Sequence, residues 1–222
     1  MAIPAIPANL RSLIVVLAVL SAVAVGLLGV LHYGSHGPDP LDRAASAAVR
    51  GIWPEAGLVA YLVDGLAAPV SALIVVAVLV VGCLATRQRR LAVVAAIGPL
   101  SAAAVATALK PLVERTIHGD NLAFPSGHTA FAAGVGLLLG LVWIGLFRPR
   151  PAVGGVVLAG LTLVVGFGMA LNQIILDAHY PSDTVGGFFT ATAVVLLTAL
   201  LIDALADLML RRGRNQEARQ SR

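Results

Sequence analysis

Long apolar runs alternate with short polar segments along most of this chain. The first run holds twenty residues from Ser12 to Leu31 that are almost all Leu, Val, Ala or Ile. Because an α-helix rises about 1.5 Å per residue, such a run covers about 30 Å, the thickness of a bilayer's hydrocarbon core. The runs that we expect to span a membrane are 10–33, 58–85, 91–113, 126–147, 151–175 and 184–210. We therefore predict an all-α, polytopic membrane protein with six transmembrane helices.

The first run also admits a second interpretation, as a cleaved signal peptide. Ala22-Val23-Ala24 resembles a cleavage site, but apolar residues continue well beyond it. We therefore favour an uncleaved first helix.

Composition agrees with this pattern, since 59% of the 222 residues are hydrophobic and only 12% are charged. The mean hydropathy of +0.93 excludes an ordinary soluble domain. The length suits one bundle, so we predict a single membrane domain over residues 1–210 and a basic, disordered cytoplasmic tail over 211–222. The one cysteine, Cys83, cannot form an intramolecular disulfide.

The segment 34–56 is rich in proline and charge and is expected to lie outside the membrane. Within it, residues 41–52 have apolar side chains at roughly helical spacing and end at Trp53. This pattern suits a helix lying in the membrane interface or, equally, a simple loop.

The basic residues are distributed unevenly between the two sides that six spans define. Four stand on one side, namely Arg43, Arg50, Lys110 and Arg115, and the other eleven of the fifteen stand on the side of both termini. The positive-inside rule therefore predicts cytoplasmic termini in a cell membrane. This distribution marks orientation and does not indicate nucleic-acid binding, although the pI is near 10. Asp203 and Asp207, near the cytoplasmic end of the last run, are expected to pair with the tail arginines, although an ion path is an alternative.

All five histidines fall at the opposite, outer side, where an enzyme would meet a lipid headgroup. The segment Pro125-Ser-Gly-His128 is typical of a helix start, with Ser126 as the cap. Free N–H groups and the positive end of the helix dipole favour a phosphate there. His128 could pass it a proton. Taken alone, this segment also fits an ordinary capped membrane helix.

Two other helix ends on the outer side carry complementary groups. His179 and Asp183 are close enough in sequence for the carboxylate to orient the imidazole as a nucleophile. Lys110 and Arg115 supply positive charge for phosphate oxygens. Each feature alone has a plainer interpretation, as a surface pair or a snorkelling lysine. Together they describe phosphoryl transfer through a phosphohistidine, with no metal or other cofactor required.

The order Lys110, Arg115, Pro125-Ser-Gly-His128, His179-x-x-x-Asp183 resembles the type-2 phosphatidate phosphatase superfamily, whose soluble relatives include bacterial acid phosphatases and vanadium haloperoxidases. The resemblance covers roughly residues 58–200. It implies a six-helix core, a metal-independent mechanism and, for membrane members, a lipid phosphate substrate. By position it also implies His179 as nucleophile, Asp183 as its partner and His128 as general acid. The phosphate binders that it implies are Lys110, Ser126 and Gly127.

The chain departs from the family pattern at two positions. Ile117 stands where an arginine is usual, and Arg115, two residues earlier, is expected to bind phosphate in its place. Gln173 stands at the second usual arginine and can donate a hydrogen bond but brings no charge. A lost charge-assisted contact of this kind is worth about 1.5–3 kcal/mol. We still expect an active enzyme, because the nucleophile, its carboxylate and the acid are all present.

The resulting hypothesis is a lipid phosphate phosphatase with an extracytoplasmic active site. The substrates considered are polyprenyl diphosphate or monophosphate, phosphatidate and phosphatidylglycerol phosphate. Richness in Ala, Val and Arg is typical of a bacterium with a GC-rich genome and favours cell-wall polyprenyl carriers. The alternatives are a lipid phosphotransferase and a non-hydrolytic lipid binder or transporter on the same scaffold.

Overall fold

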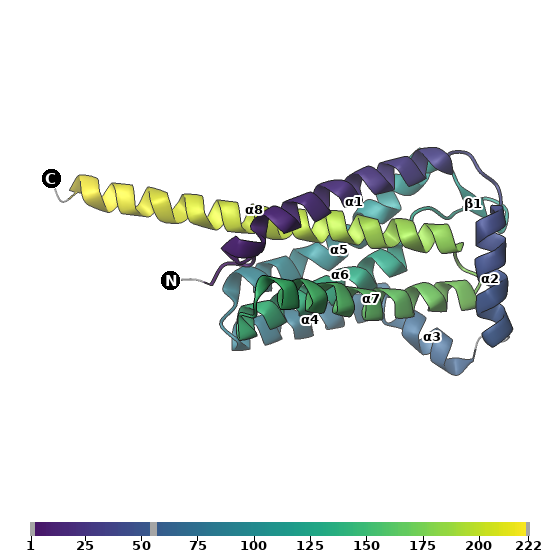
Figure 1. Cartoon of the computed structure of the whole chain (residues 1–222), viewed down its shortest axis with the longest axis horizontal. Coiled ribbons are helices and arrows are strands. Elements are labelled where there is room, and N and C mark those ends of the chain that lie inside the picture. Colours follow the sequence, from purple (N-terminus) through teal and green to yellow (C-terminus); the bar gives the residue numbers. More distant parts are fainter. Residues whose placement is uncertain (1–2, 54–56, 221–222) are drawn as a thin grey trace.

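The computed structural model describes residues 3–53 and 57–220, with the side chains at 213–215 and 217–220 left out. As predicted, the fold is all-α, with long helices running side by side (Figure 1). The helices are η1 (Ala8–Leu10), α1 (Arg11–Leu31), α2 (Pro40–Ile52), α3 (Leu58–Gly65), α4 (Pro69–Ala85), α5 (Arg89–Val113), α6 (Gly127–Phe147), α7 (Pro151–Ile175) and α8 (Pro181–Gln220). Two short antiparallel strands, β1 (Thr116–Ile117) and β2 (Asn121–Leu122), lie between α5 and α6.

Within the described residues, five helices are long and apolar enough to cross a membrane, and a bent pair makes a possible sixth span. The pair is α3 and α4, whose axes differ by 64°. The span predicted over 58–85 is therefore bent between α3 and α4. Pro69 explains the break, because proline has no N–H and its ring clashes with the preceding turn of a helix; it begins α4 instead. The protein is a multi-pass membrane protein.

Helix α6 forms the centre of the bundle and is packed against α5, α7 and α8. Small residues allow its neighbours to approach closely. At Gly136, for example, a Cβ atom would lie only 2.7 Å from the carbonyl oxygen of Leu161 in α7. Only glycine fits at this crossing.

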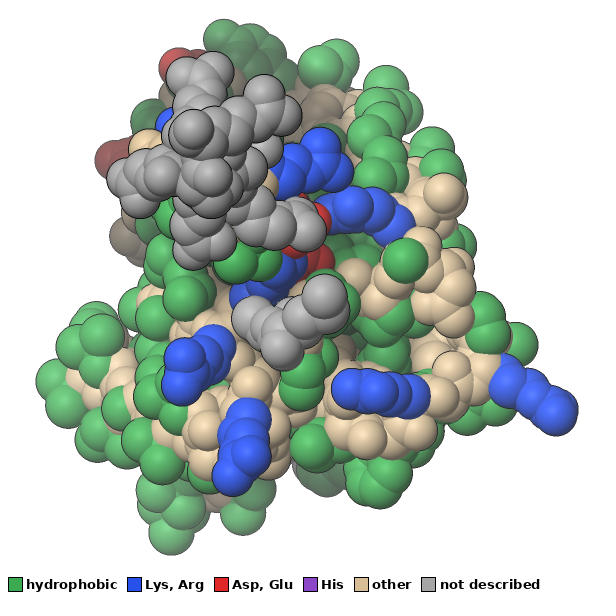
Figure 2. Space-filling model, turned by 90° about the vertical axis from the view of Figure 1, so that its left-hand side faces the viewer, with side chains coloured by type: hydrophobic (Ala, Val, Ile, Leu, Met, Phe, Trp, Pro, Cys, Tyr) green, Lys and Arg blue, Asp and Glu red, His purple; other side chains and the backbone are tan. Residues whose placement is uncertain are grey.

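The two ends of the bundle differ in character. At one end α2 lies across the ends of the long helices, with α3 and β1 beside it (Figure 1). A helix, which is one of the two options predicted for 41–52, is thus present, beginning at Pro40. The other end holds the N-terminus and exposes Arg side chains over its face (Figure 2). The exposed arginines at helix starts and connections of this end are Arg11, Arg87, Arg89, Arg148 and Arg150.

The structure corrects two predictions about the C-terminal region. Helix α8 continues to Gln220, so residues 211–220 are helical where we predict disorder, and residues 221–222 lie outside the described part of the chain. The segment after Leu210 contains no proline and several good helix formers, which permits the continuation. Among the described side chains, the cation paired with Asp203 and Asp207 is Arg90, at 2.9 and 2.8 Å, and not a tail arginine.

Candidate active site

The start of α6 has the capped geometry that the sequence predicts. Ser126 is the N-cap residue, and its Oγ accepts a hydrogen bond from the N–H of Thr129 at 3.3 Å. Its own N–H, however, donates to the carbonyl oxygen of Asp183 at 2.9 Å, and Ser126 is fully buried. The Ser126 amide is therefore occupied within the protein, and the phosphate contact expected of Ser126 stays a prediction. The N–H groups of Gly127 and His128, the first two residues of α6, have no acceptor within the helix.

Close contact between α6 and α8 brings the two predicted histidine motifs to the same place. A Cβ atom at Gly187 in α8 would lie 2.5 Å from the carbonyl oxygen of Ser126 and 3.0 Å from the Cβ of Thr129. Glycine at this position therefore lets the start of α8 press against the start of α6. The segment carrying His179 and Asp183 precedes this contact directly.

His179 and Asp183 form a buried pair, as the sequence predicts. The Nδ1 of His179 lies 3.6 Å from the Oδ2 of Asp183, and their side chains are 8% and 0% exposed. This separation is an ion-pair contact and is longer than a hydrogen bond. The same Oδ2 accepts the N–H of Tyr180 at 2.9 Å, which fixes the carboxylate beneath the imidazole. With Nδ1 facing the carboxylate, Nε2 is the ring nitrogen that can act as a nucleophile.

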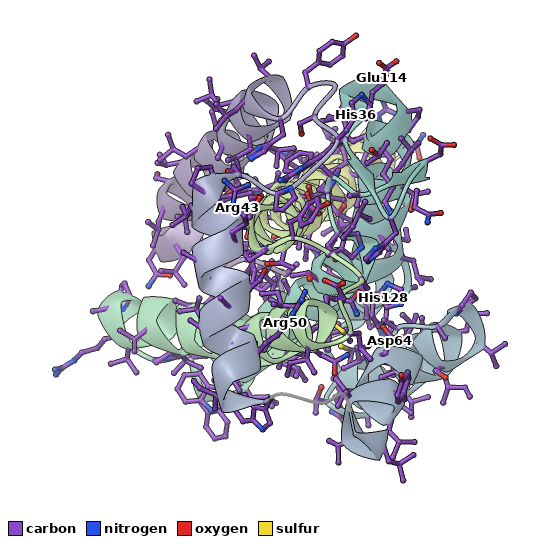
Figure 3. The ribbon with its side chains drawn as sticks, turned by 90° about the vertical axis from the view of Figure 1, so that its right-hand side faces the viewer. His36, Arg43, Arg50, Asp64, Glu114 and His128 are labelled. Atoms are coloured by element: carbon purple, nitrogen blue, oxygen red, sulfur yellow. The ribbon has the colours of Figure 1, made fainter. Side chains whose placement is uncertain are left out.

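His128 has a carboxylate partner that the sequence motifs do not reveal. Its Nε2 lies 3.6 Å from the Oδ1 of Asp64 in α3, and the two side chains are 37% and 36% exposed. Figure 3 shows both residues together at the end of the bundle that α2 crosses. His128 is also close enough to Lys110 and His179 for their charges to interact. The signal that could identify Asp64 in advance is an acidic residue inside an apolar run, which in membrane proteins is expensive and often functional.

Gln173 belongs to the same group of side chains, although it is buried. Its Nε2 donates a hydrogen bond to the Oδ1 of Asp64 at 2.7 Å. The amide thus holds the carboxylate that faces His128. Asp64 therefore competes with phosphate for the Gln173 amide.

Arg115 is placed differently from its prediction as a phosphate binder. The side chain is fully buried, and its Nη1 and Nη2 atoms donate to Asp183 at 2.7 Å and to Asp42 at 2.5 Å. The guanidinium also lies over the Tyr180 ring, 4.7 Å from the centroid. Burial raises the pKa of the Tyr180 phenol, which keeps the ring neutral beside this cation. Arg115 therefore serves the carboxylates, because its two terminal nitrogens are already engaged.

Lys110 remains as the cation in the last turn of α5. It is half-buried, makes no ion pair with any described residue, and is close enough to Asp183 for their charges to interact. This position suits the phosphate contact predicted for it.

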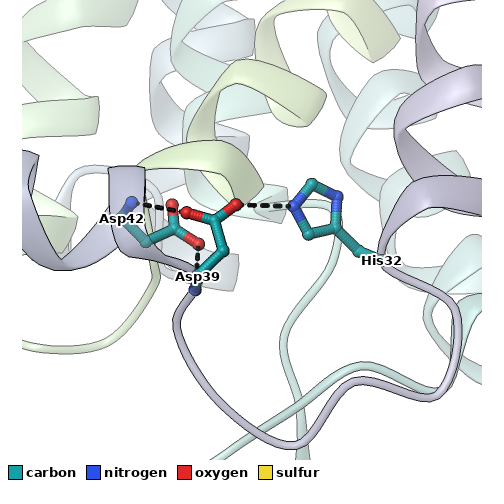
Figure 4. A group of neighbouring side chains, drawn as sticks. All are labelled: His32, Asp39 and Asp42. Atoms are coloured by element: carbon teal, nitrogen blue, oxygen red, sulfur yellow. Dashed lines mark hydrogen bonds and ion pairs between the residues drawn. The ribbon is translucent and has the colours of Figure 1, made fainter.

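One group of side chains has the spacing of a metal site. The ligand atoms of His32, Asp39 and Asp42 lie within 4.8 Å of one another (Figure 4). However, Asp42 already faces the guanidinium of Arg115. Arg115 supplies the positive charge that a metal ion would bring, and a second cation beside it would be repelled. This group does not fit a metal ion.

Comparison with known proteins agrees with the motifs. Residues 105–206 match the model of the PAP2 superfamily. No curated protein and no solved structure matches the chain. The matched segment includes the Ser126, His128 and His179 motifs, whereas Asp42 and Asp64 precede it. Members of the superfamily are generally phosphatases of lipid phosphates. The chain is therefore a multi-pass membrane protein that carries a PAP2 superfamily domain over residues 105–206.

Proposed function

We propose that this protein hydrolyses a phosphate ester of a membrane lipid through a phosphohistidine intermediate, without a metal ion. The observation that carries the proposal is the presence of two histidine–carboxylate pairs at one end of the bundle. One pair is buried and suits a nucleophile, whereas the other is open to water and suits proton transfer. Both lie beside a helix start that favours phosphate.

In the first step, the Nε2 of His179 attacks phosphorus and the bond from phosphorus to the lipid oxygen breaks. His128 gives a proton to that leaving oxygen, which departs as the lipid alcohol. Asp183 stabilises the positive charge that develops on the His179 ring. Lys110 and the N–H of Gly127 stabilise the charge on the phosphoryl oxygens.

In the second step, water replaces the histidine. His128, now neutral, takes a proton from a water molecule as the oxygen of that water attacks phosphorus. The bond from phosphorus to Nε2 breaks, inorganic phosphate leaves, and His179 and His128 return to their initial protonation states. The His128 side chain is 37% exposed, which leaves room for this water.

An apolar cavity beside the exposed pair supports a lipid substrate. The cavity has a volume of about 190 Å³ and lies between α3, α4, α6 and α7. Three of its lining residues, Val63, Phe131 and Met169, adjoin or stand one turn from Asp64, His128 and Gln173 respectively. A phosphate at the histidines could therefore place its apolar chain in this cavity.

The charges at the site favour a monophosphate. Arg115 is committed to two carboxylates, and Gln173 brings no charge. Lys110 is thus the main side-chain cation for the substrate. Because a diphosphate carries more negative charge than a monoester, we expect polyprenyl monophosphate, phosphatidate or phosphatidylglycerol phosphate to react faster than polyprenyl diphosphate.

We further propose that the arginine-bearing end faces the cytoplasm and that the histidines face outward, by the positive-inside rule. Residues 1–210 would act as one domain. The contributions of Asp42 and Asp64 to the site, from outside the matched segment, support this unity.

The decisive experiment measures release of inorganic phosphate by the detergent-purified protein and its His179→Ala variant, with EDTA present. The substrates are phosphatidate, phosphatidylglycerol phosphate, and polyprenyl monophosphate and diphosphate. Release by the wild type alone supports the phosphatase. No release from any of these, with or without an added lipid alcohol as acceptor, would refute it and favour a lipid binder. Release that appears as a new phospholipid in the presence of the alcohol would instead identify a phosphotransferase.

A further inference from the structure

Helix α2 buries a carboxylate and leaves its large apolar side chains outside. Asp42 is 1% exposed, whereas Leu41 and Ile52 are 77% and 70% exposed. Burying a charged group costs free energy unless the group is paired and hydrogen-bonded. The contact between α2 and the rest of the bundle is therefore centred on a charged side chain. The partners of Asp42 indicate the role of this contact.

A capping box holds Asp42 in place at the start of α2 (Figure 4). The Oδ1 of Asp39 accepts the N–H of Asp42 at 2.7 Å, and the Oδ2 of Asp42 faces the N–H of Asp39 at 3.4 Å. Two reciprocal contacts of this kind fix the first turn of a helix. The Asp42 carboxylate is thus presented by a rigid element.

The partners of Asp42 lie directly beside the nucleophile motif. Its Oδ1 accepts the N–H of Ser182 at 2.9 Å, and its Oδ2 accepts Nη2 of Arg115 at 2.5 Å. The hydroxyl of Ser182, 2.8 Å from Oδ1, donates to Asp42 and accepts from Nη1 of Arg115 at 2.6 Å. Charge-assisted hydrogen bonds of this length are strong and directional.

Arg115 continues the connection to His179. Its Nη1 donates to the Oδ1 of Asp183 at 2.7 Å, and the other oxygen of Asp183 faces Nδ1 of His179. One guanidinium is therefore shared between two carboxylates. With Asp42 present, Asp183 keeps negative charge for the imidazole. Without Asp42, the full charge of a buried Arg115 would fall on Asp183.

From these contacts we infer that Asp42 is a positioning residue for His179, acting through Arg115 and Ser182. The inference rests on the proposed function. Asp42 touches no substrate; through Arg115 it holds Asp183 in the place that orients the nucleophile. This role brings a residue from outside the family-matched segment into the reaction.

The test compares Asp42→Asn with Asp39→Asn, a matched control on the same helix. The N–H of Asp42 lowers the pKa of Asp39, so Asp39→Asn removes a negative charge at neutral pH, as Asp42→Asn removes the ion-pair partner of Arg115. Asparagine remains a good N-cap. The kinetic constants are measured per folded molecule on p-nitrophenyl phosphate and on phosphatidate. For Asp42→Asn we expect kcat to fall about 10- to 100-fold, as for outer-shell partners elsewhere, equally on both substrates and with KM within twofold. Asp39→Asn should match the wild type.

Ser182→Ala provides a second variant that keeps every charge. We expect a smaller fall in kcat, about three- to tenfold, again with KM unchanged, because one link between Asp42 and Arg115 is lost. If Asp42→Asn does not fold, this variant decides: a kcat equal to that of the wild type overturns the inference. The inference is also overturned if the Asp42→Asn variant is folded and fully active, or if it raises KM without lowering kcat.

The wild type and His179→Ala, run beside these variants, separate the two proposals. Equal phosphate release by those two proteins on both substrates means that the proposed function fails. Wild-type release that exceeds that of His179→Ala, together with a fully active Asp42→Asn, means that only the role of Asp42 fails.

Discussion

The two histidine–carboxylate pairs have the same separation but different surroundings. In each pair the nearest ring nitrogen and carboxylate oxygen are 3.6 Å apart. The His179 pair is buried, and its carboxylate is bound by Arg115 and by a backbone N–H. The His128 pair is more than a third exposed, and its carboxylate is held by the neutral amide of Gln173.

This contrast shows how one type of pair can take two roles. A nucleophile needs a fixed orientation and a steady partner charge, which burial and several hydrogen bonds provide. A group that gives and takes protons needs contact with the leaving oxygen and with water, which exposure provides. The surroundings, and not the residue types, distinguish the two histidines.

The largest expected effect comes from removing the buried histidine. His179→Ala should abolish turnover, with a loss of more than about 1,000-fold on every substrate, because no other described side chain takes the place of its Nε2. Phosphate release from phosphatidate and p-nitrophenyl phosphate measures this. Retention of even a tenth of the activity on either substrate would contradict the phosphohistidine.

Removal of the exposed histidine should have a smaller effect that depends on the substrate. For His128→Ala we expect a loss of about 100- to 10,000-fold on a lipid phosphate, the usual worth of a general acid. The loss should be much smaller on p-nitrophenyl phosphate, whose leaving group needs little protonation. Comparing kcat on the two substrates checks this. Equal losses would remove the distinction between the two pairs.

The carboxylate of the exposed pair should show the same substrate dependence more weakly. Asp64→Asn removes the charge that stabilises protonated His128 but keeps an acceptor for Gln173. We expect a fall in kcat of about tenfold on phosphatidate and little change on p-nitrophenyl phosphate, since about 1.4 kcal/mol corresponds to a tenfold change in rate. An effect on the aryl phosphate equal to that on the lipid would place Asp64 with the nucleophile instead.

The smallest effect should come from the cavity beside the exposed pair. Gly168 lines this cavity, and a Cβ atom there would meet no other atom within 4 Å. Gly168→Leu should therefore fill the cavity without disturbing the helix, raising KM for long-chain phosphatidate several-fold and leaving p-nitrophenyl phosphate unaffected. Gly160→Leu is the control, since Gly160 lies on the same helix and is equally open. Similar KM values for both variants on the lipid would exclude the cavity as the site of the chain.

Much of the fold follows from local pattern. Apolar runs of about twenty residues predict the spanning helices, and Ser126 predicts the start of α6, because hydrophobic length and capping are properties of neighbouring residues. The bend before Pro69 also has a local cause that the apolar pattern obscures. The prediction of a disordered tail fails for a different reason, because a polar composition permits a helix as well as disorder.

Within the candidate site, the sequence by itself identifies His128, His179, Asp183 and Lys110, because motif spacing and residue chemistry mark them. The roles of Asp42, Asp64 and Arg115 depend on tertiary structure. Their partners are distant along the chain: Asp42 meets a serine 140 residues away, and Arg115 meets a carboxylate 68 residues away. A buried arginine binds the strongest acceptors within reach. Only packing of α2 and α8 around Arg115 decides that these acceptors are carboxylates of the protein and not a phosphate.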